Sequence, residues 1–381
     1  MSNLQKAVII DGARTAFGKL GGKLSSLSAS DLGSVAIKEA LKRSNIGTEQ
    51  VDEVIMGTVL QAGQGQIPSR QAATKAGIPY SVKTETINKV CAFGLRSVTL
   101  ADQLIRLGEE QVIVAGGMES MSNAPYLLPK GRFGLRMGDA TLVDGMVYDG
   151  LSCAFHAKHV HMGTYGDETA DKFLVSRKTQ DEWAIRSHQK AIAAIEEGKF
   201  SEEIASVTIP QRKGDDVIVN TDEAPRKDTS IEALSKLKSA FSQDGTITAG
   251  NAPGVNIIGH AEVGVEPNDF PQTPGLVINK ILEKTGKTVE DIDLFEINEA
   301  FAVVALASSQ IAGLDLEKVN VNGGAVALGH PIGASGARII LTLAYELKRR
   351  GGGIGIAAIC SGGGQGDAIM IEVPIQGGVK K

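Results

Sequence analysis

A histidine lies inside a stretch of small residues, 322–338, which holds five glycines and four alanines. Glycine lets the backbone approach a ligand closely and adopt positive φ, and Pro331 restricts the backbone directly after His330. In residues 339–350 the apolar positions recur at helical spacing and end in cations, and Gly351 ends the pattern. The sequence therefore predicts that His330 lies in a tight loop that opens a helix.

A glycine-rich loop before a helix is also typical of phosphate or dinucleotide binding. Two observations argue against that reading. The first strand–helix unit carries no G-x-G-x-x-G motif, and no G-K-[ST] follows a glycine-rich loop. A histidine is an unusual choice for an anion-binding loop, because its charge depends on its neighbours. Spacing alone leaves a catalytic and a structural His330 equally open.

The three cysteines are scattered, and none forms a C-x-x-C pair. Cys91 lies between a predicted strand, 84–90, and a helical pattern that ends at Gly108. Backbone N–H groups at a helix N-terminus favour a thiolate, so Cys91 is a candidate nucleophile. Cys153 lies in an irregular region and is interpreted as a small buried hydrophobic residue. Three cysteines are too few for a disulfide framework, which predicts free thiols and a cytoplasmic protein.

Composition excludes several classes of function. With 39 Lys and Arg against 44 Asp and Glu, the net charge is −5, which argues against nucleic acid or an anionic membrane as partner. The first residues lead directly into a strand, so no signal peptide is expected. The sequence contains no run of 18 apolar residues, so no membrane-spanning helix is expected. The 381 residues are enough for two or more core-forming units.

The second half of the chain repeats the first. Residues 40–57 resemble residues 281–298, Gly94-Leu-Arg96 matches Gly336-Ala-Arg338, and residues 112–115 match 354–357, at offsets of 241 or 242 positions. An irregular insertion is predicted at 123–166, followed by a helix at 177–197 with Ser176 as N-cap and a loop-rich segment at 207–254. Two similar halves that pack face to face would bring together the loops after equivalent strands. Four residues lie in such loops: Cys91, Asn298, His330 and Cys360.

Five segments resemble motifs of the thiolase family. They are NKVCAFGL at 88–95, GGMESMS at 116–122, NEAF at 298–301, NGGAVALGHPIGASG at 322–336 and CSGGG at 360–364. The resemblance runs through nearly the whole chain. It implies an α/β protein with a thiolase-like layered fold, made of two similar βαβ-type halves and an inserted loop domain. The domain bounds that it implies are 1–119, 120–248 (the insertion), 249–256 (a truncated return to the first half) and 257–381.

The resemblance also implies an activity, acetyl transfer between two acetyl-CoA molecules through an acyl-cysteine. Cys91 would be the nucleophile, His330 its base, and Cys360 the acid/base for the α-proton. His330 and a water held by Asn298 would stabilise the enolate oxygen, while the N–H groups of Cys91 and Gly362 would face the acyl-enzyme oxyanion. Positions that match the family's CoA contacts are His161, Met162, Arg226, Phe241, Ala249 and Phe301.

CoA thioesters are expected as substrates, with no permanently bound cofactor, no metal site, and a homodimer or homotetramer as the assembly. Two alternatives remain open: a 3-ketoacyl-CoA thiolase for longer chains, and a non-catalytic acyl-CoA or lipid carrier of the same fold. The chain departs from the family at Pro253, where a serine is usual. After Asn256 the family continues with a strand and a helix, whereas residues 257–267 follow at once here. The last strand of the first half and its helix are therefore predicted to be missing.

Overall fold

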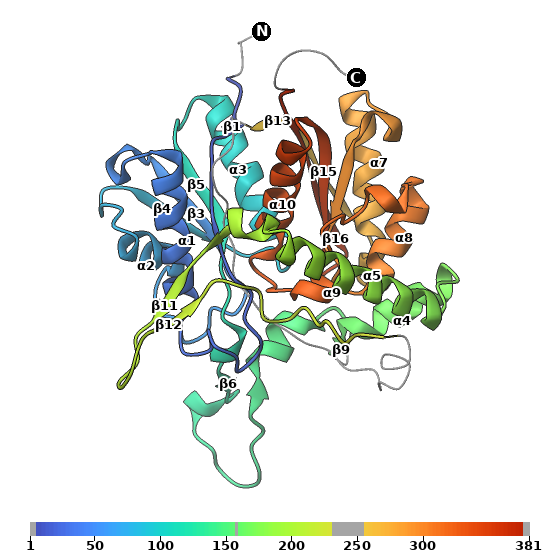
Figure 1. Cartoon of the computed structure of the whole chain (residues 1–381). Coiled ribbons are helices and arrows are strands. Elements are labelled where there is room, and N and C mark those ends of the chain that lie inside the picture. Colours follow the sequence, from blue (N-terminus) through green and yellow to red (C-terminus); the bar gives the residue numbers. More distant parts are fainter. Residues whose placement is uncertain (1–4, 157–158, 231–254, 376–381) are drawn as a thin grey trace.

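The computed structural model describes residues 5–156, 159–230 and 255–375, and its elements form five layers (Figure 1). Two β-sheets are separated by helices α3 (Phe93–Leu107) and α10 (Ser335–Arg349). The outer face of the first sheet carries α1 (Ala29–Ser44) and α2 (Pro68–Lys75), and that of the second carries α7 (Thr273–Thr285) and α8 (Ala302–Ala312). This is the layered α/β architecture predicted from the sequence.

The first sheet has three parallel strands in the order β4–β3–β5, with bounds Lys83–Ile87, Glu53–Gly57 and Ile113–Gly117. The second sheet has the order β1–β13–β16–β15–β14. Its strands are Val8–Ile9, Val255–Gly264, Gln365–Val373, Gly353–Ser361 and Leu294–Ile297. In both sheets, the strands that correspond in the internal repeat end next to α3 and α10. The loops from the two halves meet there.

The matched residues of the internal repeat contact each other where α3 and α10 cross. A Cβ added to Gly336 would lie 2.3 Å from the backbone nitrogen of Leu95, and one added to Gly94 would lie 2.8 Å from the nitrogen of Ala337. Any side chain here would force the helices apart, which is why small residues occupy both positions. Helix α10 begins at Ser335, earlier than the apolar pattern predicted, because its first turn is made of these small residues.

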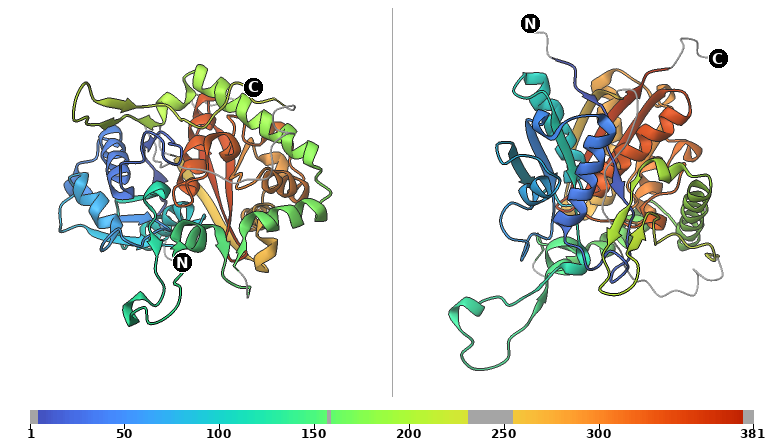
Figure 2. Two further views of the ribbon diagram at one scale, coloured as in Figure 1. Left: turned by 90° about the horizontal axis from the view of Figure 1, so that it is seen from below. Right: turned by 60° about the vertical axis from the view of Figure 1, so that its left-hand side comes forward.

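The inserted region is more regular than its sequence suggested. It contains short strands and helices: β6 (Tyr126–Leu127), β7 (Val143–Asp144), β8 (Ser152–Cys153), β9 (Val160–His161), α4 (Met162–Lys172), α5 (Arg177–Glu196), β10 (Ile204–Ala205), β11 (Val207–Ile209) and β12 (Val217–Val219). The predicted cap of α5 is confirmed, since the side chain of Ser176 accepts a hydrogen bond from the N–H of Thr179 at 3.1 Å. Residues 126–144 project from the body as a narrow arm (Figure 2).

The two halves differ at one position in their sheets. In the second half, β16 lies between β13 and β15, but no strand among the described residues lies between β1 and β5. Strand β1 pairs with β13 instead, and a cavity of about 190 Å³ lies beside β5, lined mainly by apolar side chains. Residues 112–115 stay partly exposed, whereas Gly355–Ser361 of β15 is buried. The strand predicted to be missing would occupy this position.

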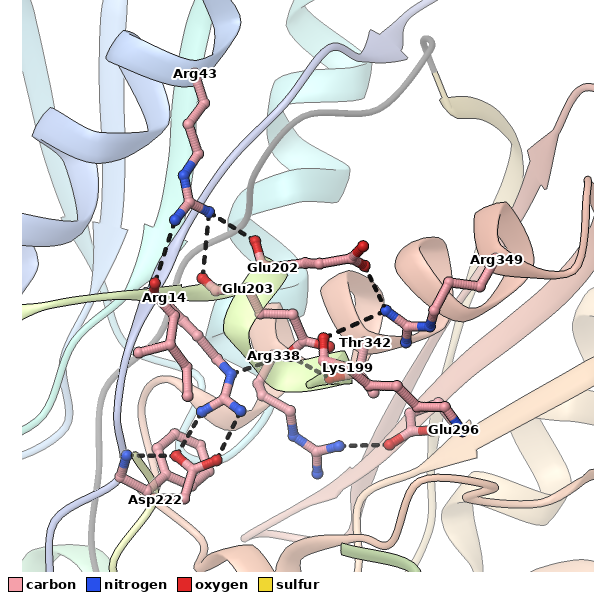
Figure 3. A network of polar contacts seen from close by, with 12 residues as sticks. Arg14, Arg43, Lys199, Glu202, Glu203, Asp222, Glu296, Arg338, Thr342 and Arg349 are labelled. Carbon is pink, nitrogen blue, oxygen red and sulfur yellow. Dashed lines mark hydrogen bonds and ion pairs between the residues drawn. The ribbon is translucent and has the colours of Figure 1, made fainter. Parts of the chain in front are cut away.

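A buried network of charges fastens the inserted region to both halves (Figure 3). Arg14, in β2 (Arg14–Thr15), lies 2.9 Å from a carboxylate oxygen of Glu203 and donates two hydrogen bonds to Asp222, at 2.6 and 2.7 Å. Thr342 of α10 donates to Glu203 at 3.2 Å. The side chains of Arg14, Glu203 and Asp222 are fully shielded from solvent in these pairs. Through Thr342, this network connects the insertion to α10, the helix that follows His330.

Replacing Arg14 by methionine is expected to lower the free energy of unfolding by about 3–5 kcal/mol, because two buried carboxylates lose their cation. Urea unfolding followed by circular dichroism measures this change. Lys178→Met, which breaks an ion pair whose lysine side chain is 77% exposed, serves as control and should change stability by less than about 1 kcal/mol. Equal effects of the two substitutions would contradict a structural role for the network.

Candidate active site

A strained turn presents Cys91 between β4 and α3. Val90 has a φ of 46°, a region that a branched side chain disfavours, so its neighbours must impose this conformation. The side chain of Asn88 accepts a hydrogen bond from the N–H of Val90 at 3.0 Å, and the hydroxyl of Ser361 donates to the carbonyl of Lys89 at 2.6 Å. The second half of the chain therefore helps to fix the position of Cys91.

Two cysteines from the two halves meet at this turn. The backbone N–H groups of Gly362 and of Cys91 itself act on the Cys91 sulfur and favour its thiolate, and Cys360 is near enough for the charges of the two thiols to interact. Cys91 is partly exposed, while Cys360 is fully buried near the end of β15. The structure thus brings together Cys91, Gly362 and Cys360, which the sequence analysis singled out.

Both thiols are protonated in the ligand-free site. Burial raises the pKa of Cys91 to about 12, and the N–H donors offset this only in part. Burial, followed by the proximity of Cys91, raises the pKa of Cys360 well above its usual value. The expectation that the start of α3 would favour a Cys91 thiolate was therefore wrong for this state, because removing water from the thiolate costs more than the N–H groups return.

His330 lies in the predicted loop before α10, and its hydrogen bonds define its tautomer. Nδ1 is 2.6 Å from the hydroxyl of Ser335, which already donates its hydrogen to the carbonyl of Pro331 at 2.9 Å. We assign the hydroxyl hydrogen to the carbonyl of Pro331, so the hydrogen between Nδ1 and Ser335 belongs to the imidazole. Nε2 is left unprotonated, and it is buried with no hydrogen-bond partner among the described residues. It can accept a proton from a group that enters the site.

Asn298 follows β14 and lies beside the same imidazole. Its Nδ2 is 3.4 Å from Nδ1 of His330, while its Oδ1 is buried without a described partner. Because Nδ1 is a donor, the amide turned over is the better orientation, with Oδ1 facing the imidazole. Nδ2 then takes the buried position that has no described partner and is a free donor. Asn298 and His330 together offer one donor and one acceptor at the same place.

His330 is neutral near pH 7. Burial and, to a smaller extent, the positive charge of Arg338 lower the pKa of His330 to about 4. A neutral thiol and a neutral imidazole therefore occupy the resting site. The proton must leave Cys91 together with attack on a substrate, as in general-base catalysis, and not in a separate earlier step.

A buried carboxylate, Glu299, forms hydrogen bonds with the segment that precedes His330. It accepts hydrogen bonds from Trp183 at 3.0 Å and Ser187 at 2.8 Å, both on α5, and from the N–H of Val326 at 3.0 Å. Val326 belongs to the short helix α9 (Ala325–Leu328), which precedes His330. The inserted region thereby holds the catalytic loop in place.

The matched CoA positions are spread around this site. Met162 and Phe301 pack against the core cluster that contains Cys360. His161 is half-buried, accepts a hydrogen bond from the N–H of Gly163 at 3.1 Å, and has its pKa lowered by burial. Arg226 is exposed, and its N–H donates to His188. The remaining two matched positions, Phe241 and Ala249, lie outside the described residues.

Comparison with known proteins decides the family. The model of the thiolase N-terminal domain matches residues 7–257, and that of the thiolase C-terminal domain matches residues 251–373. The chain belongs to the thiolase family. An acetyl-CoA acetyltransferase of Allochromatium vinosum is 46% identical, over 97% of this chain and 99% of its own. A probable acetyl-CoA acetyltransferase of Mycolicibacterium smegmatis is 49% identical, over 96% of this chain and 100% of its own.

A solved structure supports the same assignment. The crystal structure of the Bacillus anthracis acetyl-CoA acetyltransferase superposes with a TM-score of 0.92 at 38% identity, over 97% of this thiolase and 100% of that chain. No helix in the described part of the chain is long and apolar enough to cross a membrane. The described His, Cys, Asp and Glu side chains form no group of three or more that could hold a metal ion.

The structure of this thiolase adds residues that the sequence analysis did not single out. Ser335 sets the tautomer of His330, and Glu119 is a buried carboxylate that accepts hydrogen bonds from Thr58, Val59 and Leu60. Ser335 is the one hydroxyl residue in a loop of glycine and alanine, a signal that could have identified it. The position of Glu119 follows only from how the loops pack.

Iodoacetamide at neutral pH is expected to modify Cys91 before Cys153 or Cys360, because only Cys91 keeps contact with solvent. Peptide mass mapping over time measures the order. Unfolded protein, in which all three thiols should react at similar rates, is the control. Earlier labelling of Cys153 would remove Cys91 as the accessible nucleophile of this thiolase.

Proposed function

We propose that this thiolase is an acetyl-CoA C-acetyltransferase, which reversibly condenses two acetyl-CoA molecules to acetoacetyl-CoA and CoA. The observation that carries the proposal is the meeting of Cys91 and Cys360 beside the N–H of Gly362. A Claisen condensation needs one group to hold an acyl chain and another to move an α-proton, and two thiols in one site supply both. The names of the relatives support acetyl-CoA as the substrate.

In the first half-reaction, the sulfur of Cys91 attacks the thioester carbon while its proton passes to Nε2 of His330. The N–H groups of Cys91 and Gly362 stabilise the oxyanion that forms. Cys360 is a thiol at this stage, so it can give its proton to the departing CoA sulfur. The products are free CoA, acetyl-Cys91, a Cys360 thiolate and a protonated His330.

In the second half-reaction, the Cys360 thiolate removes an α-proton from a second acetyl-CoA. The enolate oxygen is held by the Nε2–H of His330 and by a water on Asn298. The enolate carbon attacks the acetyl group, the bond between that group and Cys91 breaks, and the proton of His330 returns to Cys91. All groups regain their resting protonation, so one set of side chains serves both half-reactions.

We assign His161 and Met162 to the pantetheine part of CoA, and Phe301 to the CoA-binding site. Arg226 is assigned to the adenine end, and Phe241 and Ala249 to the pocket, on the resemblance alone. The proposal includes no permanently bound cofactor and no metal. The three cysteines are free thiols, which supports the cytoplasm as the compartment.

The proposal is tested by comparing thiolysis of acetoacetyl-CoA with that of a long-chain 3-ketoacyl-CoA by the purified protein. An acetyltransferase should prefer acetoacetyl-CoA and should form an acetyl adduct at Cys91. Pre-incubation with acetyl-CoA should then also protect Cys91 from iodoacetamide. Preference for the long chain would favour the alternative thiolase. Tight CoA-ester binding without thiolysis would favour the carrier.

We propose that the projecting arm, residues 126–144, contributes to a homo-oligomer. Phe133 is 85% exposed and Met137 is 99% exposed. Large exposed apolar side chains that lie close together are typical of a protein–protein interface. The double substitution Phe133→Ser and Met137→Ser is expected to reduce the mass measured by light scattering after size exclusion. Leu174→Ser, at a residue 90% exposed outside the arm, is the control and should leave the mass unchanged. A double variant with unchanged mass would contradict the proposal.

A further inference from the structure

Lys89 connects the turn of Cys91 to the second half of the chain through both its backbone and its side chain. Its carbonyl accepts a hydrogen bond from the hydroxyl of Ser361 at 2.6 Å. Its Nζ lies 2.8 Å from a carboxylate oxygen of Asp367, on β16, and 2.5 Å from one of Glu262, on β13. The side chain of Lys89 is 16% exposed and that of Asp367 is 1% exposed. The ammonium group is therefore held mainly by the two carboxylates and not by water.

The second sheet places these two carboxylates directly opposite each other. Glu262 and Asp367 are partners in the antiparallel ladder of β13 and β16, and like charges at opposite positions destabilise a sheet. Lys89 offsets this repulsion, and in the described part of the chain it is the one cation that forms an ion pair with Asp367. Arg96 of α3 forms a second ion pair with Glu262 at 2.9 Å. The second sheet thus offers a site for a cation, and the residue two positions before Cys91 fills it.

The strand that carries Asp367 is also paired with the strand that carries the second thiol. In the ladder of β15 and β16, Cys360 pairs with Gly366, the residue before Asp367. Cys360 and Asp367 are therefore fixed relative to each other by adjacent positions of one ladder. Because Lys89 forms its ion pair with this ladder, it fixes the turn of Cys91 relative to Cys360.

We propose that Lys89 is a positioning residue: its ion pairs with the two opposed carboxylates hold the turn of Cys91 in place beside Cys360. The proposal rests on the proposed acetyl transfer. Val90, between Lys89 and Cys91, has a φ of 46°, a conformation that persists only while its surroundings impose it. Without the ion pairs the turn relaxes, and the sulfur of Cys91 moves relative to the N–H of Gly362. A displacement of about 1 Å costs up to about 100-fold in rate where reacting groups must be aligned.

Lys89→Met keeps a long side chain and removes its charge. Burial raises the pKa of Asp367 to about 6, so this carboxylate is ionised at pH 8, where the variant is tested. Acetylation of Cys91 by saturating acetyl-CoA is expected to slow by about 10–100-fold. The acetyl-CoA concentration that gives half the maximal rate should change little, because neither Lys89 nor its partners are assigned to CoA binding. Rapid-quench mass spectrometry measures both quantities, and acetylation at the unmodified rate would refute the proposal.

The double variant Lys89→Met/Asp367→Asn separates position from stability. The single variant leaves a buried carboxylate without its cation, so its Tm should fall, whereas the double variant lacks that charge and its Tm should recover. Acetylation, measured well below both Tm values, should stay slow in the double variant, because the turn is still not held. Recovery of acetylation together with Tm would show a merely structural role. Lys75→Met is the matched control, since it breaks an ion pair with Asp31 at 2.7 Å between α1 and α2, and it should acetylate at the unmodified rate.

Hydrogen–deuterium exchange measures the turn without any acetyl transfer. Peptides that cover residues 88–92 should exchange faster in both Lys89 variants than in the unmodified protein, while Glu53–Gly57 of β3 should exchange alike in all of them. Slow acetylation with unchanged exchange at residues 88–92 would overturn the positioning role. If the unmodified protein is not acetylated at all, the proposed function fails, and the exchange measurement still decides whether Lys89 fixes the turn.

Discussion

Cys91→Ala protein is expected to carry no acetyl group after incubation with acetyl-CoA, because no other described thiol both contacts solvent and faces backbone donors. Turnover should fall by roughly 10⁶-fold, the scale seen when a catalytic nucleophile is removed. Intact-mass spectrometry detects the adduct as one added acetyl group, and acetoacetyl-CoA thiolysis measures turnover. Loss of both would assign the acyl-carrying role to Cys91.

Cys153→Ala is the matched control for this experiment. Cys153 is also a free cysteine, but it is buried in the same core cluster as Tyr165. Its removal should leave acetylation intact and change stability only modestly. A Cys91→Ala protein that acetylates at Cys360 would contradict the assignment, and proteolytic mapping of the adduct would reveal it.

Cys360→Ala is expected to fail at removal of the α-proton, and not at acyl transfer to Cys91. Acyl transfer to Cys91 requires no α-proton abstraction, so the variant should still become acetylated, although more slowly because the CoA sulfur loses its proton donor. Condensation and thiolysis should fall by about 10²–10⁴-fold, as when a positioned acid/base is removed. Mass spectrometry of the adduct and steady-state turnover, measured on the same sample, separate the two steps.

His330→Ala is the comparison for Cys360→Ala, because His330 serves both half-reactions. It should damage acetylation and condensation alike. Condensation by Cys360→Ala at the unmodified rate would remove Cys360 as the base for the α-proton. Equal damage to both steps in Cys360→Ala and His330→Ala would show that the two residues do not divide the chemistry as proposed.

The sequence predicted the elements of the site well where local signals exist. Pro68 at the start of α2, Ser176 at the start of α5 and Gly351 after α10 mark helix ends because each satisfies or removes a terminal backbone group. The internal repeat predicted that matched loops converge, and Gly94 and Gly336 indeed contact opposite helices. These features depend on neighbours in the sequence or on the repeat itself.

What the sequence could not predict depends on burial. A cysteine at a helix entry suggested a thiolate, but the surrounding protein raises the pKa of Cys91 to about 12. The role of Ser335 depends on where its single hydrogen points, and Glu119 receives its hydrogen bonds from residues 58–60, which are distant in sequence. Dielectric environment and long-range hydrogen bonding are properties of the packed chain, so no local pattern encodes them.

The gap between β1 and β5 also affects which part of the protein unfolds first. The sheet β4–β3–β5 shares no ladder with the second sheet in the described part of the chain, so helix packing and side-chain contacts, and not strand pairing, couple the two sheets. A sheet without lateral bonds to its neighbour can unfold as a separate cooperative unit. Amide hydrogens of Ile113–Gly117 should therefore exchange with deuterated solvent faster than those of Gly355–Ser361, and the first half should set the kinetic lifetime of the native state.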